Sequence, residues 1–257
     1  MRDVLESLAA GELSVEDAEA ALAGYVTNEV GRFDAARETR RGIPEAILAA
    51  GKSPEEVAAL ATTALETTGH AIVTRTTQEH RTAIERAVAD RPRRPELIVD
   101  ERSSVVTLHE PDYSPPDLDA TVGIVTAGTA DGGPAGEAQT VLRELGVDVV
   151  RIDDVGVANL TRVIDRLEEI RSQDVVIVAA GREGALPTVV AGLVDVPVIG
   201  LPISTGYGHG GDGQAALAGL LQSCTVLSVV NIDAGYVAGC QAGLIARKFA
   251  ELRTANN

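Results

Sequence analysis

Three side chains in the second half of the chain are of types that carry chemistry in enzymes. Cys224 is a candidate nucleophile, Glu183 is the one carboxylate in a glycine-rich turn, and Asp131 lies in a second such turn, TADGGPAG. A glycine-rich turn that opens a helix presents free N–H groups to an anion such as phosphate, and its aspartate could hold a metal or a proton. These residues predict an anion-binding pocket with a thiol available for covalent chemistry.

Each of these residues also has an ordinary structural interpretation. Asp131 could cap the helix that follows it, and the turn around Glu183 could be a tight packing connection. A lone cysteine is often a small buried hydrophobic residue, which describes Cys240 better than Cys224. The four histidines show no metal-ligand spacing, and CxxC and HExxH motifs are absent from the sequence, so we expect no structural zinc.

The elements that position these residues are apolar runs followed by turns. Residues 175–180 and 196–201 carry no polar alternation, which is typical of strands buried on both faces of a parallel sheet. Glycines and prolines follow both runs, and they allow the backbone to approach a ligand closely. Since ligands bind at the carboxyl ends of such strands, we expect a site there.

A regular alternation of strands and helices begins after residues 109–120, where three prolines and four acidic residues interrupt the periodicity. It predicts an α/β, flavodoxin-like parallel sheet of five strands with helices on both faces. The expected strands lie near 121–127, 147–152, 174–180, 196–201 and 226–232, and the expected helices near 134–145, 158–172, 185–194, 213–223 and 237–253.

The first part of the chain predicts a small α/β domain over residues 1–110, followed by a linker at 111–120 and the larger domain at 121–257. Helix-capping patterns indicate helices over 14–24 and 53–69, and a third helix is expected near 77–90. Short strands are expected at 71–75, 96–100 and 104–109.

The composition excludes some classes of partner. The formal net charge is −16, which would repel the phosphate backbone of a nucleic acid and an anionic membrane. We expect a cytoplasmic protein, since the sequence has neither the apolar core of a signal peptide nor a run long enough to span a bilayer. The two cysteines are expected to be free thiols.

Several motifs, taken in order, resemble the LarB family. They are AGTAD (127–131), REGALPTVVAGL (182–193), PVIGLPISTGYG (197–208), QSC (222–224) and VVNIDAG (229–235). The N-terminal string RETRRGIPEAILAAGKSPEEV (37–57) is similar to a segment that LarB proteins carry and the more distantly similar PurE proteins lack. The resemblance covers nearly the whole chain and implies a PurE-like C-terminal domain.

The resemblance implies a carboxylase and hydrolase that acts on nicotinic acid adenine dinucleotide during nickel-pincer cofactor biosynthesis. The Cys224 thiolate would add to the pyridinium ring, and the resulting enamine would attack CO2. Glu183 would accept the ring proton before the thiolate leaves. Hydrolysis of the phosphoanhydride would release AMP.

Further expectations follow from the same resemblance. Substrate and phosphate would be bound by residues of the glycine-rich turns and the last connection: Gly128, Thr129, Asp131, Gly181, Gly184, Ser204, Gly206, Tyr207, Asn231 and Asp233. Mg²⁺ is implied, with Asp131 as its candidate ligand, and no organic cofactor is expected to be bound. A homo-octamer or another homo-oligomer is expected.

The order of the elements adds a constraint on the site. Cys224 precedes its strand whereas Glu183 follows its own, so they should lie at opposite edges of the sheet and meet only at a subunit interface. Two alternatives remain open. One is a PurE-like aminoimidazole ribonucleotide carboxylase or mutase, disfavoured because Ala185 stands where PurE proteins have histidine; the other is a nucleotide-binding module without activity.

Overall fold

The computed structural model describes residues 2–256 except 12, 16–17, 19–21 and 23. The chain divides into two compact units, Met1–Ser114 and Pro115–Asn257. The helix expected over 14–24 falls largely outside the described residues. In the part of the chain that the structure describes, no helix combines the length and the apolar character needed to cross a bilayer.

The first unit contains a four-stranded mixed sheet in the order β3-β4-β6-β5. Its elements are α1 (Arg2–Ala10), β1 (Val26–Thr27), β2 (Arg32–Phe33), α3 (Arg37–Arg41), β3 (Ala46–Leu48), α4 (Pro54–Thr68), β4 (His70–Thr74), α5 (Gln78–Ala89), β5 (Glu96–Asp100) and β6 (Val105–His109). The core of this unit forms where α4 and α5 pack against the sheet. Sequence reasoning missed α3 and the short strands β1 to β3, since elements of two to five residues have little periodicity. It also missed α1, a helix of nine residues.

The start and the end of α4 show why the capping pattern was informative. The Ser53 side chain accepts a hydrogen bond from the N–H of Glu56, whose carboxylate in turn accepts one from the N–H of Ser53. Gly69 ends the helix in the left-handed conformation, with φ at 80°. The helix predicted at this position is therefore confirmed.

The second unit contains a five-stranded sheet in the order β11-β10-β9-β7-β8, and all its neighbouring strands pair in parallel. Its elements are β7 (Leu118–Thr126), η1 (Thr129–Asp131), α6 (Gly132–Glu144), β8 (Val147–Ile152), η2 (Val157–Asn159), α7 (Thr161–Ile164), α8 (Leu167–Arg171), β9 (Val175–Ala180), α9 (Ala185–Ala191), β10 (Val198–Pro202), α10 (Gln214–Leu221), β11 (Ser228–Val229) and α11 (Gly235–Asn256).

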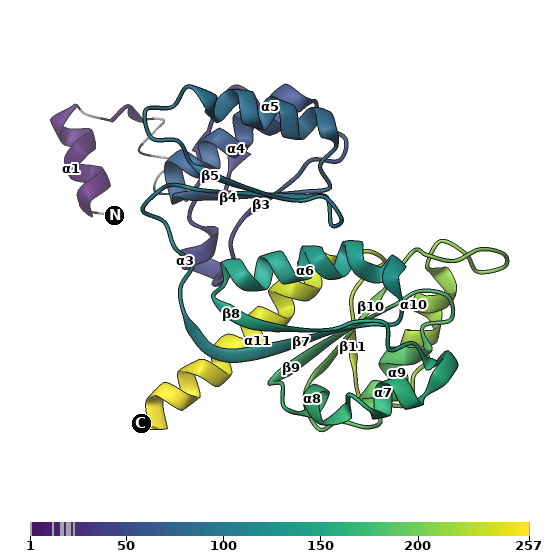
Figure 1. The fold of residues 1–257 in the computed structure, drawn as a ribbon. Helices are drawn as coiled ribbons and strands as arrows, with labels where there is room; N and C mark the ends of the chain where they lie inside the picture. Colours follow the sequence, from purple (N-terminus) through teal and green to yellow (C-terminus); the bar gives the residue numbers. More distant parts are fainter. Residues whose placement is uncertain (1, 12, 16–17, 19–21, 23, 257) are drawn as a thin grey trace. The chain divides into compact units, whose positions relative to one another are not determined.

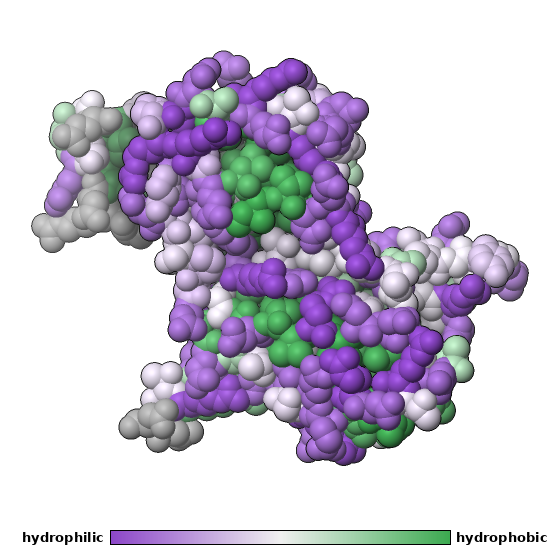
Figure 2. Space-filling view, viewed as in Figure 1, coloured by the Kyte–Doolittle hydropathy of each residue, from purple (hydrophilic) through white to green (hydrophobic). Residues whose placement is uncertain are grey.

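Helices cover both faces of this sheet. The helices α6 and α11 pack together on one face, and α9 and α10 pack on the other (Figure 1). Every residue of β9 is buried, which explains its continuous apolar run. Hydrophobic residues gather between the helices and the sheet of each unit, whereas hydrophilic residues cover the outward surface of α6 (Figure 2). The predicted fold class is confirmed.

Two elements of this unit differ from the expectation. The strand expected at 226–232 is only Ser228–Val229, because it is an edge strand paired with β10 alone and Val226 is 95% exposed. The helix expected at 158–172 is divided into η2, α7 and α8. Within α7 and α8 only Val163 and Ile170 are buried, so tertiary packing does little to hold one continuous helix.

Candidate active site

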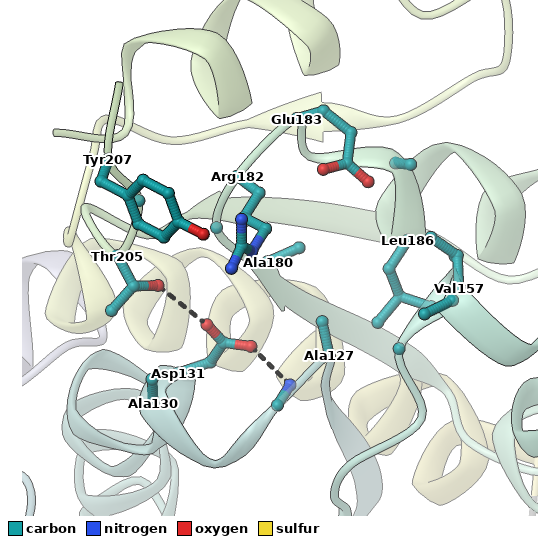
Figure 3. A pocket seen from close by; sticks show the side chains of 16 residues that line it. Ala127, Ala130, Asp131, Val157, Ala180, Arg182, Glu183, Leu186, Thr205 and Tyr207 are labelled. Carbon is teal, nitrogen blue, oxygen red and sulfur yellow. Dashed lines mark hydrogen bonds between the residues drawn. The ribbon is translucent and has the colours of Figure 1, made fainter. Parts of the chain in front are cut away.

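A pocket of about 460 Å³ lies at the carboxyl ends of β7, β8, β9 and β10. The connections that follow these strands supply its lining, as Figure 3 shows. In an open parallel sheet this edge is where ligands bind. The fold therefore gathers residues from four separate stretches of sequence around one cavity.

Asp131 lies on the β7 side of the pocket and is 4% exposed. Its Oδ2 accepts a 2.8 Å hydrogen bond from the N–H of Gly128, and its Oδ1 accepts one from the Thr205 hydroxyl at 3.4 Å. Burial raises the pKa of Asp131, although the hydrogen bonds from Gly128, Thr205 and Ala127 oppose that effect. Asp131 therefore holds its own turn, η1, whereas its side chain makes no capping hydrogen bond to α6, the role that the sequence had left open.

The connection after β9 carries Glu183 and lies directly against the connection after β10. A Cβ atom on Gly181 would lie 2.4 Å from the carbonyl oxygen of Thr205, so only glycine fits there. The N–H of Arg182 donates to the same carbonyl over 3.0 Å. These contacts hold the backbone beside Glu183, whose carboxylate lines the pocket (Figure 3).

The pocket has two chemically different ends. Ala127, Val157 and Leu186 line one end, where Leu186 and Val157 belong to the same apolar cluster. Asp131, Thr205, Arg182 and Tyr207 lie at the other end (Figure 3). A cavity that combines an apolar wall with a few convergent polar groups is typical of a small-molecule binding site.

The structure brings six of the expected site residues into the lining: Gly128, Asp131, Gly181, Glu183, Gly206 and Tyr207. The lining does not contain the other six: Thr129, Gly184, Ser204, Cys224, Asn231 and Asp233. Asp233 nevertheless supports the site, since its Oδ1 accepts a hydrogen bond from the N–H of Ser204 at 2.9 Å. It thereby anchors the start of the connection that carries Thr205 and Tyr207.

Cys224 is exposed and lies in the connection from α10 to β11. The hydroxyl of its neighbour Ser223 accepts a 3.0 Å hydrogen bond from Thr188 within α9, and Thr225 packs beside Gly192 at the end of α9. Glu183 instead precedes α9, a helix of seven residues, about 10 Å in length. Cys224 and Glu183 therefore lie toward different ends of α9, as the order of the elements predicts.

Sequence reasoning missed two polar side chains of the pocket, Arg182 and Thr205, together with apolar residues such as Val157 and Leu186. Arg182 immediately precedes Glu183 and carries the one positive charge among the described pocket residues. Its guanidinium lies over the Tyr207 ring, 4.9 Å from the centroid. The position of Arg182 in the same glycine-rich turn was an available signal, but spacing alone does not show which side chains of a turn enter a cavity.

The described residues do not by themselves form a complete site for the implied Mg²⁺. Magnesium sites in proteins use one or two free carboxylates together with substrate phosphates. Both carboxylate oxygens of Asp131 already accept hydrogen bonds. Among the described residues, no group of three or more His, Cys, Asp or Glu side chains could hold a metal ion. We therefore assign no step of the reaction to a metal held by these residues.

Comparisons with known proteins divide the chain in the same order. Residues 25–110 match the LarB/PurE-like N-terminal domain, and residues 121–256 match AIR carboxylase. The uncharacterized protein MJ0165 of Methanocaldococcus jannaschii is 33% identical over 258 residues, which cover 96% of this chain and 97% of that protein. Two solved structures from Treponema denticola each cover 51% of this chain and 80% of their own: PurE, with 22% identity and a TM-score of 0.41, and a PurE2 variant, with 25% and 0.40.

Proposed function

The chain belongs to the LarB family, and from this premise we propose that it carboxylates the pyridinium ring of nicotinic acid adenine dinucleotide and releases AMP, in nickel-pincer cofactor biosynthesis. The AIR carboxylase domain indicates a carboxylase-type function. The observation that carries the finer proposal is the pocket itself, in which Glu183 stands beside an apolar wall.

A pyridinium ring is electron-poor and does not attack CO2 until a nucleophile has added to it. In the proposed reaction the Cys224 thiolate forms a C–S bond to the ring, and the enamine that results forms a C–C bond to CO2. Glu183 then accepts the proton from the carboxylated ring carbon. The electron pair of that C–H bond restores aromaticity as the C–S bond breaks and the thiolate leaves.

Within one subunit Cys224 lies outside the pocket, so we propose that it enters the pocket of a neighbouring copy. Its surroundings support this proposal. Leu221 and Val226 flank it in sequence and are 65% and 95% exposed. Large apolar side chains that are strongly exposed near a reactive group are typical of a surface that another chain covers. A homo-oligomer, with an octamer as the expected form, would then be required for activity.

The proposal is tested by incubating the protein with nicotinic acid adenine dinucleotide and bicarbonate, with and without Mg²⁺, and measuring product masses. We expect a pyridinium mononucleotide with one added carboxyl group, together with AMP. Cys224→Ser should abolish both products, whereas Cys240→Ser should retain them because Cys240 is buried in α11. Normal turnover by Cys224→Ser would overturn the covalent mechanism.

The AIR carboxylase match also favours a second candidate, a PurE-like carboxylase or mutase. The described pocket lining contains no histidine, so it lacks the proton-transfer group expected of that reaction. Conversion of carboxyaminoimidazole ribonucleotide would support this second function. Binding of the dinucleotide without turnover, unaffected by loss of Glu183 or Cys224, would instead indicate a nucleotide-binding module.

A further inference from the structure

Arg182 occupies a backbone conformation that its residue type disfavours. Its φ is 51°, in the left-handed region that L-residues other than glycine rarely adopt. Glycine, which adopts this conformation without strain, occurs at positions 181 and 184 of the same connection but not at 182. An arginine held in a strained conformation at the edge of a pocket points to a function for its side chain.

The contacts of Arg182 do not provide a structural reason for its charge. Among the described residues, no carboxylate lies within ion-pair distance of its guanidinium, whereas Arg166 and Arg171 of the same unit pair with Glu169 and Glu168. Its guanidinium lies over the Tyr207 ring, which is 81% exposed. A cation–π pair that is exposed to solvent contributes little to stability. The contact therefore orients the guanidinium more than it stabilises the fold.

The charges around the pocket show what this guanidinium is suited to bind. Asp131 and Glu183 also line the pocket, and the chain has a net charge of −16. An anionic substituent of a ligand would be repelled by these groups unless a local cation received it. Arg182 is the one described cation in the lining, and the guanidinium fork matches the two oxygens of a carboxylate.

We propose that Arg182, oriented by Tyr207, binds the carboxylate on the pyridinium ring and so distinguishes the nicotinic acid dinucleotide from its nicotinamide counterpart. This inference rests on the proposed function and deepens it by assigning substrate selection to one residue. Arg182 directly precedes Glu183, which is proposed to act on the ring itself. In the dinucleotide the ribose separates the phosphates from the pyridinium ring. The anion nearest to a residue beside Glu183 is therefore the ring carboxylate, and we favour it as the group that Arg182 binds.

The test compares the affinities of the acid and amide dinucleotides by calorimetry, with bicarbonate omitted so that no carboxylation occurs. We expect the wild type to bind the acid at least about tenfold more tightly than the amide. Arg182→Gln should lose that preference by weakening the acid alone, and Arg182→Lys should retain part of it because it keeps the charge without the fork. Arg166→Gln, at an ion-paired surface arginine, is the matched control.

Other outcomes would overturn the assignment. Equal weakening of both dinucleotides in Arg182→Gln would indicate a phosphate contact, and unchanged affinities would indicate a structural role only. A wild type that binds both ligands equally, or neither, would also contradict it. If the preference for the acid dinucleotide depends on Arg182 but the wild type makes no carboxylated product, the assignment of carboxylate binding to Arg182 stands and the proposed reaction is wrong.

Discussion

Asp131 and Thr205 lie 74 residues apart in the sequence, and their side chains meet in the pocket, where the Thr205 hydroxyl donates to Asp131 Oδ1 over 3.4 Å. This bond joins the connection after β7 to the connection after β10. The Asp131 carboxyl group is buried, and desolvation raises its pKa. The contact therefore has a consequence for stability that depends on pH.

Asp131→Asn should make the protein more stable at neutral pH. A raised folded-state pKa means that the contribution of Asp131 is complete below its unfolded value of about 4, and is lost as the pH rises through the folded-state value. Asparagine removes this loss, and its Oδ1 can still accept from the N–H of Gly128. The gain in unfolding free energy should grow from pH 4 toward pH 8 when measured by urea denaturation.

The exposed Asp148 on β8 provides the control, since Asp148→Asn removes a charge without relieving burial. Its effect should be within about 0.5 kcal/mol and nearly independent of pH. A loss of stability in Asp131→Asn at neutral pH would show that the hydrogen bonds outweigh the desolvation.

Gly219→Ala should impair the site by displacing Glu183. Gly219 lies in α10, and a Cβ atom there would be 2.4 Å from the carbonyl oxygen of Glu183. The turn must move to accommodate the methyl group, so we expect a loss of about 1–3 kcal/mol in stability and a fall in turnover of about tenfold or more. Gly31→Ala is the matched control, because nothing lies within 4 Å of a Cβ atom there. Full activity in Gly219→Ala would show that the exact position of Glu183 is unimportant.

The sequence was sufficient to predict the sheet but only part of the pocket. The wholly apolar β9 identifies a strand buried on both faces, and its following turn identifies the ligand-binding edge. The extent of β11 could not be read in this way, because pairing on one side and the exposure of Val226 depend on tertiary position. Arg182 was missed because its inward placement depends on the contact between two turns, through Gly181 and Thr205.

Mixing two inactive variants tests whether the site is shared between subunits. Glu183→Gln retains the thiol and Cys224→Ser retains the carboxylate, so a hybrid interface can restore one complete site. Random reassembly should recover about one quarter of wild-type turnover, since that fraction of interfaces pairs the two intact residues. The samples must be dissociated and reassembled together, and their carboxylation activity is then measured.

Reassembly of Glu183→Gln with the double variant Glu183→Gln/Cys224→Ser is the control, because that mixture contains no intact glutamate and should stay inactive. An inactive mixture of the two single variants would indicate that both residues act within one subunit, after a rearrangement of the connection that carries Cys224.

The end of α11 is held by a partly exposed ion pair between Asp174 and Arg253, which should be sensitive to acid. Asp174 Oδ1 accepts from Arg253 at 2.6 Å, and its Oδ2 accepts from Arg253 at 3.0 Å and from the N–H of Thr121 at 2.8 Å. Burial by itself would raise the pKa of Asp174, but the hydrogen bonds and the charge of Arg253 lower it overall. Its stabilising contribution is therefore present above the unfolded value of about 4, and it is lost as the pH falls through the folded-state pKa.

Asp174→Ala should cost about 1 kcal/mol at neutral pH, because it removes a partly exposed ion pair and leaves the N–H of Thr121 without its acceptor, while Arg253 still donates to the carbonyl oxygen of Asp119. Lys248→Gln removes an exposed pair with Glu251 on the same helix and should cost less than about 0.5 kcal/mol. Unfolding free energies measured across pH, with hydrogen exchange over residues 250–256, check both values. The deficit of Asp174→Ala should shrink as Asp174 becomes protonated in the wild type, and a deficit that persists in acid would instead assign the loss to packing.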